Sequence, residues 1–245
     1  MPVAIVTGSS RGIGRVIALR FAGDGYDVAV NYIESEEGAA SVVDKIEDET
    51  DREAIAVRAD VSDPDAAARL VERTVEAFGG VDHLVNNAGI DQHVYTEDLA
   101  PADFDRVMDV NVNGAFNVTK YALSPLRDSD VPEGPSVVNV SSILAYTGAP
   151  IECHYASSKA ALLGLTRSHA ADFAPEIRVN AIAPGHVETD MTADRSEEEK
   201  REQKEAILLG RFGQPEDIAE AAAYLRDAGF VTGETLNVNG GELMR

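Results

Sequence analysis

The sequence predicts an α/β protein built on a doubly wound parallel sheet of about seven strands, with helices on both faces. Short runs rich in valine, isoleucine and alanine alternate along the chain with longer amphipathic stretches, and the first such run leads straight into a glycine-rich turn. Alternation of this kind is typical of parallel strands joined by crossover helices. With 245 residues and no internal repeat, a single domain over residues 1–245 is the simplest organisation.

The first three strands are predicted where β-branched residues cluster between turn-forming residues. They are expected at Val3–Thr7, Asp27–Asn31 and Ala54–Ala59. Helices are expected after each of them, because apolar residues recur there at helical spacing. Their ranges are Arg15–Ala22, Glu36–Glu49 and Pro64–Phe78, and Asp63 is the N-cap that opens the last of these.

The rest of the chain continues the alternation. Strands are expected at Asp82–Val85, Ser136–Val140, Ile177–Ile182 and Thr235–Val238. Helices are expected at Pro101–Asp109, Val112–Leu126 and Cys153–Phe173. The segment 189–210 is rich in charge and precedes a further helix. We expect a mobile substrate lid there, and a solvated surface helix is an equal alternative.

The charge balance excludes several classes of partner. The chain has 43 acidic and 21 basic residues, a net charge of −22, and only five of its cations are lysines. A field of this sign repels nucleic acid and anionic membranes, so neither is expected as a partner. Because the acids are spread along the chain instead of forming a tail, a salt-adapted, halophilic surface explains them better than disorder does.

The remaining composition indicates a cytoplasmic protein without a metal site. Apolar runs are much shorter than the roughly 20 residues that span a bilayer, and Met1 leads directly into a strand without a signal-like region. The single cysteine, Cys153, excludes a disulfide framework and a Cys-rich zinc site. His154 lies next to it, but the pair has no further metal ligands at useful spacing.

The stretch Tyr155-Ala-Ser-Ser-Lys159 carries the chemistry, together with Ser142 thirteen residues upstream. On a helix, Tyr155 and Lys159 share one face about a turn apart. A neighbouring ammonium favours the phenolate, so we expect Lys159 to lower the pKa of Tyr155 below its usual value of about 10. Such a phenol can exchange protons with a carbonyl or an alcohol near neutral pH.

The turn after the first strand is a phosphate-binding device. Its glycines are Gly8, Gly12 and Gly14, and a helix follows at once. Glycines let the backbone approach a pyrophosphate, while the helix N-terminus supplies N–H groups and the positive end of its dipole. The sequence therefore predicts a Rossmann-type fold that binds a dinucleotide.

Together these motifs resemble the short-chain dehydrogenase/reductase family over nearly the whole chain. The quoted motifs are Thr7-Gly8-Ser-Ser-Arg-Gly12-Ile-Gly14, Asp60-Val61, Asn86-Asn87-Ala88-Gly89, Asn111, the Ser142/Tyr155/Lys159 set and Pro184-Gly185. The ending Val231–Gly241 is similar to that of 3-oxoacyl-ACP reductases and acetoacetyl-CoA reductases. The resemblance implies a set of cofactor-binding residues: Gly8, Ser10, Arg11, Gly12, Ile13, Gly14, Asn31, Asp60, Val61, Asn87, Ala88, Gly89, Tyr155, Lys159, Pro184, Gly185, Val187 and Thr189.

The same resemblance implies the catalytic roles. Tyr155 is the acid/base, and Lys159 lowers its pKa and holds the nicotinamide ribose. Ser142 hydrogen-bonds the substrate oxygen, and Asn111 positions a water that links Lys159 to solvent. The spacing to Tyr155 selects Ser142 over Ser141, and a donor at the end of a parallel strand can stabilise charge on a carbonyl oxygen.

Cofactor preference depends on two positions. NAD-dependent enzymes carry an acid at the end of the second strand to bind the ribose 2′-hydroxyl, whereas this strand ends in Asn31-Tyr32. Arg11 lies in the glycine turn, where a guanidinium can face a 2′-phosphate. Glu34 is close enough to serve as the acid and is the counter-argument. NADP(H) is therefore favoured over NAD(H).

The expected activity is NADPH-dependent reduction of a 3-oxoacyl thioester, and a dehydrogenase of a sugar or secondary alcohol is the alternative. A non-catalytic redox sensor is disfavoured, because it would not need the proton relay. Carrier proteins are acidic, and both the stretch His169–Glu176 and the loop that begins at Asp91 lack a basic patch, which favours a CoA thioester.

His93, Tyr95, Cys153 and His154 are possible pocket residues, and His186 borders the nicotinamide pocket. The resemblance also implies a homotetramer through the two long helices, where Leu162, Leu163 and Leu165 could contribute.

Overall fold

The computed structural model describes residues 1–189 and 197–244. In this part of the chain, seven parallel strands form one sheet in the order β3-β2-β1-β4-β5-β6-β7. The strands are β1 (Val3–Val6), β2 (Asp27–Tyr32), β3 (Ala54–Arg58), β4 (His83–Asn86), β5 (Ser136–Val140), β6 (Arg178–Pro184) and β7 (Thr235–Val238). The predicted doubly wound parallel sheet is confirmed, and the strand order reverses between β1 and β4.

The central strands are buried on both faces. Ile5 pairs with Leu84, Leu84 with Val137, and Val137 with Val179, so one apolar row crosses four strands. All four side chains have no exposed surface. Along β1, β5 and β6 every residue is buried. A parallel sheet that is covered on both faces buries the side chains on both sides of each strand, so these strands show no simple alternation between buried and exposed residues.

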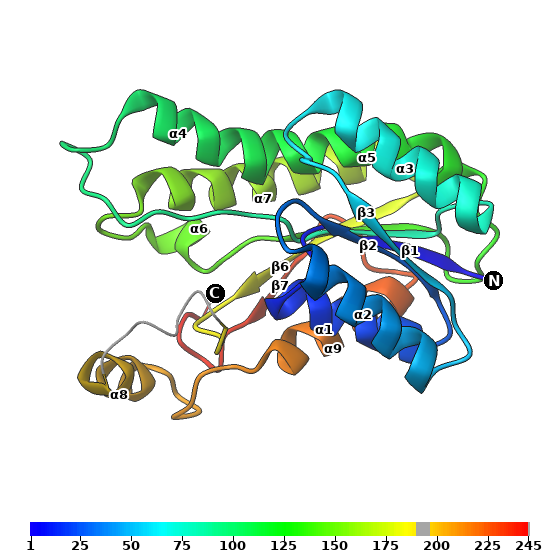
Figure 1. Cartoon of the computed structure of the whole chain (residues 1–245). Coiled ribbons are helices and arrows are strands. Elements are labelled where there is room, and N and C mark those ends of the chain that lie inside the picture. Colours follow the sequence, from blue (N-terminus) through cyan, green and yellow to red (C-terminus); the bar gives the residue numbers. More distant parts are fainter. Residues whose placement is uncertain (190–196, 245) are drawn as a thin grey trace.

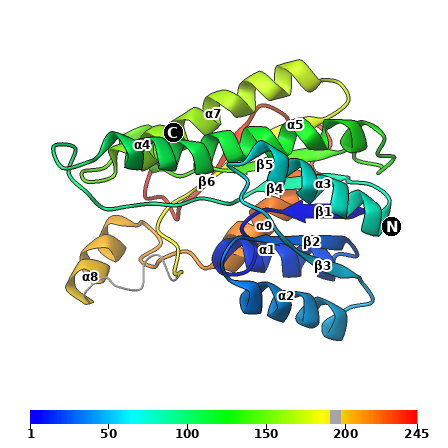
Figure 2. The same cartoon turned by 45° about the horizontal axis from the view of Figure 1, so that its top comes forward.

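Two layers of helices cover the sheet (Figures 1 and 2). One layer contains α1 (Gly12–Gly23), α2 (Glu36–Glu49) and α9 (Pro215–Asp227), and the other contains α3 (Pro64–Phe78), α4 (Pro101–Met108), α5 (Gly114–Arg127) and α7 (Cys153–Phe173). Each layer has its own buried cluster, in which Phe21 and Ile218 are members of the first and Leu70 and Leu126 of the second. The two clusters lie on opposite sides of the sheet and fix its position.

The predicted break between two helices near residue 110 is absent. A π-helical segment, η1 (Asp109–Asn113), joins α4 to α5 without interruption. The prediction was wrong here, because a π-helical turn accommodates an extra residue without ending a helix. Two further helices had no predicted range: the short α6 (Leu144–Thr147), and α9, which begins with Pro215 and a capping box between Gln214 and Asp217.

The charged segment near residue 200 does form a helix, α8 (Glu197–Ala206). It stands apart from the two layers, beyond the end of the sheet at which the strands terminate (Figure 1). Residues 190–196, about a third of the predicted lid, lie outside the described residues. None of the helices in the described ranges is long and apolar enough to cross a bilayer.

Candidate active site

The glycine turn between β1 and α1 brings two loops into direct contact. Gly8 has a φ of +61° and Gly12 a φ of +57°, which favour glycine over other residues. A Cβ on Gly8 would lie 2.9 Å from the Cα of Ala88, and one on Gly14 would lie 2.5 Å from Nδ2 of Asn87. A Cβ on Gly12, by contrast, would meet nothing within 4 Å. The turn is therefore closed toward the loop after β4 and open in front of the N-terminus of α1, which suits a bound pyrophosphate.

Hydrogen bonds lock these two loops together. Oγ1 of Thr7 accepts from the backbone N–H groups of Asn87 and Ala88 at 2.9 and 3.0 Å. Nδ2 of Asn87 donates to the carbonyl oxygens of Thr7 and Gly8 at 2.9 and 3.1 Å. Thr7 belongs to the quoted motif but was absent from the predicted site residues. Its signal in the sequence is a hydroxyl directly after a buried strand.

Asn31, at the end of β2, also serves the glycine turn. Its side chain is buried, with Oδ1 accepting from the N–H of Gly8 at 3.1 Å and Nδ2 donating to the carbonyl of Ala59 at 3.0 Å. Both ends of the amide are thus bonded within the protein, so Asn31 positions the turn. Arg11 and Glu34, in contrast, are both exposed beside it.

The predicted adenine pair follows β3. Ser62 donates its N–H and its hydroxyl to Oδ1 of Asp60 at 3.0 and 2.6 Å, and Arg106 donates to Oδ2 at 3.1 Å. Burial raises the pKa of Asp60, but these hydrogen bonds together hold it below its usual value. Val61 is buried against Gly114 of α5, where a Cβ would approach Val61 to 2.6 Å. The pair is thereby fixed between β3 and the opposite helix layer.

The loop after β6 closes the other side of the site. The carbonyl of Pro184 accepts from Ile143 at 2.9 Å, and the N–H of Gly185 donates to Val238 at 3.0 Å. Val187, which is buried, pairs with Gly213. The remaining predicted residues of the cofactor set lie in the same loops or in the first turn of α1: Ser10, Ile13, Gly89 and Thr189.

His186 was predicted to border the nicotinamide pocket. In the structure Nδ1 of the His186 ring lies 2.6 Å from Oε1 of Glu242, and the backbone N–H of His186 donates to Oε2 of the same carboxylate at 3.1 Å. Its ring stacks on Phe212, with the centroids 5.7 Å apart. The pair joins the loop after β6 to the C-terminal segment, which the sequence did not indicate.

Ser142, Tyr155 and Lys159 meet where β5 ends against α7. The Ser142 hydroxyl lies close enough to the Tyr155 phenol to lower its pKa, and its Oγ accepts from the N–H of Leu144 at 3.1 Å. Nζ of Lys159 lies 5.3 Å from the centroid of the Tyr155 ring and donates to the carbonyl of Val140 at 2.9 Å. Ser141 is buried and turns the other way, donating to the carbonyl of Lys159 at 2.8 Å. The structure therefore offers Ser142, and not its neighbour, to a group bound at Tyr155.

The predicted lowering of the Tyr155 pKa is wrong for this structure. Burial raises the pKa of Tyr155, and the negative charges of Asp91 and Glu152 add to it, while the hydrogen bond from Ser142 opposes them. Burial lowers the pKa of Lys159 to about 8, against the opposing effect of Asp91. The lysine is held by Val140 and is itself less basic than usual, which explains why the i, i+4 spacing alone does not acidify the phenol.

Asn111 lies in the π-helical segment and is buried. Its Oδ1 accepts from the N–H of Ile90 at 2.8 Å, and its Nδ2 donates to the carbonyl of Ile90 at 3.0 Å and to Oγ of Ser158 at 2.9 Å. A Cβ on Gly89 would lie 3.3 Å from Oδ1 of Asn111 and 3.4 Å from Nζ of Lys159. The side chain thus braces the loop after β4 against α7, immediately beside the lysine.

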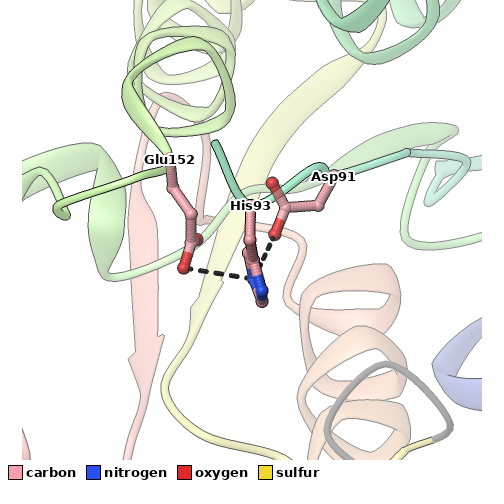
Figure 3. Close-up of side chains that lie close together, drawn as sticks. All are labelled: Asp91, His93 and Glu152. Carbon is pink, nitrogen blue, oxygen red and sulfur yellow. Dashed lines mark ion pairs between the residues drawn. The ribbon is translucent and has the colours of Figure 1, made fainter. Parts of the chain in front are cut away.

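Residues that the sequence offered as pocket candidates are scattered. His154 is fully buried, Cys153 is partly exposed, and the Tyr95 side chain is mostly exposed. His93 instead lies between Asp91 and Glu152 (Figure 3), a group of three that the sequence did not predict. Its members come from two separate segments, so no spacing motif could have revealed it.

Comparison with known proteins connects this geometry to characterised relatives. The model of the family described as "Enoyl-(Acyl carrier protein) reductase" matches residues 8–242. The chain is 40% identical to the 3-oxoacyl-[acyl-carrier-protein] reductase FabG of Staphylococcus aureus, covering 98% of each protein. It is 39% identical to the FabG of Aquifex aeolicus, covering 98% of this chain and 96% of that protein.

Solved structures agree with the fold. A dehydrogenase/reductase from Sinorhizobium meliloti superposes with a TM-score of 0.93 at 40% identity, over 99% of this chain and 95% of that one. A short-chain dehydrogenase from Burkholderia cenocepacia, determined in complex with NADP, superposes with a TM-score of 0.91 at 39% identity, over 98% and 97%.

Proposed function

This chain belongs to the short-chain dehydrogenase/reductase family, and we propose that it reduces the 3-oxo group of an acyl thioester to the 3-hydroxy group with NADPH. As a family member it is an NAD(P)-dependent oxidoreductase acting on C=O and CH–OH groups. The curated relatives that match it over nearly their whole length are 3-oxoacyl-ACP reductases, and this supports the substrate class.

The observation that carries the proposal is the placement of the Ser142 hydroxyl beside the Tyr155 phenol, where it lowers the pKa of that phenol. Two hydroxyl donors that meet at one point can both donate to a single acceptor oxygen placed there. A ketone oxygen accepts two hydrogen bonds and gains negative charge during reduction, so this pair matches it. Reduction of a carbon–carbon double bond, which the family model's description would suggest, puts no oxygen at the reacting carbon.

The catalytic residues then act as follows. Bound NADPH supplies the hydride. Ser142 holds the ketone oxygen through its hydroxyl, and Tyr155 gives that oxygen its phenolic proton. Lys159, when charged, stabilises the phenolate that remains on Tyr155. Asn111 keeps Gly89 and the loop after β4 against Lys159, and the predicted water relay at Asn111 is part of the proposal.

Two features support NADPH over NADH. Arg11 is exposed in the glycine turn, where it can pair with a 2′-phosphate. The end of β2 carries Asn31, which is neutral and whose side chain is committed to Gly8 and Ala59. Glu34 is exposed nearby and opposes the preference. The Burkholderia cenocepacia relative was solved with NADP, which agrees with this assignment.

Charge around the site favours a CoA thioester over a carrier-protein substrate. Asp91 and Glu152 place negative charge beside Tyr155, where an acidic carrier protein would be repelled. Lys200, Arg201 and Lys204 line a hollow on α8 together with Glu205, beyond the end of the sheet at which the strands terminate (Figure 1). A flexible CoA tail can bring its phosphates to such a hollow, whereas a folded acidic carrier protein must dock beside Asp91 and Glu152.

We also propose that residues 1–245 form one domain, that the segment 189–210 closes over the substrate, and that the chain forms a homotetramer. Among the leucines predicted for the tetramer contact, Leu162 and Leu163 are buried within the chain and only Leu165 is partly exposed. Phe116 of α5, with 44% of its surface exposed, is a better candidate. Light scattering after gel filtration measures the assembly directly.

The test of function is the initial rate with acetoacetyl-CoA in molar KCl, with NADPH compared with NADH. We expect rapid oxidation of NADPH and a slower rate with NADH. Tyr155→Phe keeps the ring but removes the proton, so turnover should fall by roughly 10²–10⁴-fold while NADP binding stays unchanged. Turnover by this variant at the wild-type rate would refute the assignment, and no rate with either cofactor would favour a sugar or secondary alcohol substrate.

A further inference from the structure

Asp91, His93 and Glu152 point toward one another (Figure 3), and the two carboxylates lie near enough to Tyr155 to raise its pKa. Asp91 and His93 belong to the loop after β4, and Glu152 immediately precedes α7. Nε2 of His93 lies 3.3 Å from Oδ2 of Asp91 and 3.4 Å from Oε1 of Glu152. The three ligand atoms all lie within 4.8 Å of one another. We call this group the mouth cluster.

The distances in the mouth cluster fit a metal ion better than a shared proton. Charge-assisted N–H···O hydrogen bonds are about 2.7–2.9 Å long, and both separations from Nε2 of His93 are longer than that. A zinc ion about 2.0–2.1 Å from each ligand places tetrahedral ligands roughly 3.3–3.4 Å apart. The separations of 3.3 and 3.4 Å from the imidazole nitrogen to the carboxylate oxygens match two edges of that tetrahedron.

The two segments of the mouth cluster are held together by the protein itself. The N–H of Val94 donates to the carbonyl of Ile151 at 2.8 Å, which joins the residues next to His93 and Glu152. The Asp91 and Glu152 side chains are only 12% and 15% exposed, whereas that of His93 is 53% exposed. The carboxylates are therefore largely shielded from solvent, and the exposed side of the imidazole leaves room for a water as the fourth ligand.

We propose that Asp91, His93 and Glu152 bind one zinc ion, or a similar divalent transition metal, at the mouth of the active site. Imidazole suits such metals, whereas magnesium and calcium prefer oxygen ligands alone. Two carboxylates balance the charge of a divalent cation. The net charge of −22 on the chain also raises the local concentration of cations around it.

Metal in the mouth cluster acts on the proposed reaction, and this part rests on the proposed function. Asp91 and Glu152 both raise the pKa of Tyr155, and Asp91 also raises that of Lys159. A cation that neutralises these carboxylates lowers both pKa values. Reduction needs Tyr155 protonated and Lys159 charged, so zinc moves the alkaline limb of the reduction rate to lower pH.

The experiment is calorimetric titration of zinc into the full chain after EDTA treatment and dialysis, in molar potassium nitrate to suppress diffuse binding. We expect one ion per chain. His93→Ala and Glu152→Gln should each weaken binding at least about tenfold, because losing even a group that only orients a metal ligand costs about 10–100-fold in affinity. The matched control is Glu97→Gln, which removes an exposed carboxylate from the same loop and should leave zinc affinity unchanged. Magnesium should bind weakly, and equally to wild type and His93→Ala.

Two results would overturn the site: no zinc binding by the folded wild type, or equal affinity in wild type and His93→Ala. Binding is measured without substrate or cofactor, so a chain that binds one zinc through His93 but reduces no thioester refutes the proposed function and leaves the site standing. If zinc binds through His93 but does not shift the alkaline limb of the reduction rate, the proposed effect of zinc on the pKa values of Tyr155 and Lys159 is refuted.

Discussion

The titration of Lys159 predicts a fall in activity within an accessible pH range. The Lys159 ammonium is buried beside Tyr155, and burial lowers its pKa to about 8 in the cofactor-free protein. Neutral Lys159 cannot stabilise the phenolate that forms when Tyr155 gives up its proton. The rate of reduction should therefore follow the charged fraction of Lys159, which is about 0.9 at pH 7 and about 0.1 at pH 9 for a pKa near 8. At pH values well above the pKa of Lys159, we expect the reduction rate to decrease roughly tenfold per pH unit.

The measurement is kcat/KM for NADPH between pH 6.5 and roughly 10, because this parameter reports the ionisation of the enzyme that the cofactor meets. Solutions contain EDTA, so that no metal at the mouth cluster moves the curve. Burial and nearby carboxylates raise the pKa of Tyr155, which keeps the phenol protonated over this range. The break should therefore belong to Lys159.

Two variants identify the group that titrates. Lys159→Arg carries a guanidinium that stays charged in this range, so its profile should be flat even where its rate is lower. Asp91→Asn removes the charge that raises the pKa of Lys159, and the break should move to lower pH. A profile with no break below about pH 10, or an identical break in Lys159→Arg, would refute the reasoning.

Three further predictions concern stability. Asn31→Ala removes the acceptor of the Gly8 N–H and should lower the free energy of unfolding by about 1–3 kcal/mol in a urea titration. His83 is buried, and burial lowers its pKa to about 3. Its contribution to the free energy of unfolding is therefore complete above about pH 6.5 and is lost as pH falls toward 3, at up to about 1.4 kcal/mol per pH unit. His83→Gln should flatten this dependence of stability on pH in denaturation curves. The net charge of −22 predicts a melting temperature that rises between low salt and molar KCl, because salt screens carboxylate repulsion.

Each of these has a clear contrary outcome. An Asn31→Ala protein as stable as wild type would mean that another group satisfies Gly8. Equal pH slopes for wild type and His83→Gln would assign acid destabilisation to the carboxylates. A melting temperature that does not change between low salt and molar KCl would remove the argument for a halophilic surface.

The sheet could be predicted from the sequence because its signals are local. Val3–Val6 is apolar at every position and ends in a glycine turn, and Ser136–Val140 and Arg178–Pro184 repeat such buried runs. A parallel sheet covered on both faces requires them, so the pattern and the fold determine each other. The loops that carry the cofactor set were predictable for the same reason, since parallel strands bring their carboxyl ends to one edge.

What the sequence did not reveal depends on distant contacts. Asn31 is at the expected place, but its amide is bonded to Gly8 and Ala59, and only the packing of β1, β2 and β3 determines that. The π-helical segment around Asn111 has no composition that distinguishes it from an ordinary helix. The mouth cluster joins two loops that are separated along the chain by α4, α5, β5 and α6, so no spacing rule applies to it.

The Tyr155/Lys159 pair shows where a motif stops being sufficient. Spacing places both residues on one face of α7, but it does not fix the direction of a four-carbon side chain. In the protein alone Nζ donates to Val140, and Asp91 and Glu152 raise the pKa of the phenol. A tyrosine with a raised pKa keeps its proton, which is the state a reductase needs before it donates to a ketone. The same carboxylates oppose the reverse reaction, in which the phenol must first lose that proton. Asp91 and Glu152 therefore set the pH at which the phenol loses its proton, and replacing both with amides should move the acidic limb of the oxidation rate and the alkaline limb of the reduction rate together to lower pH.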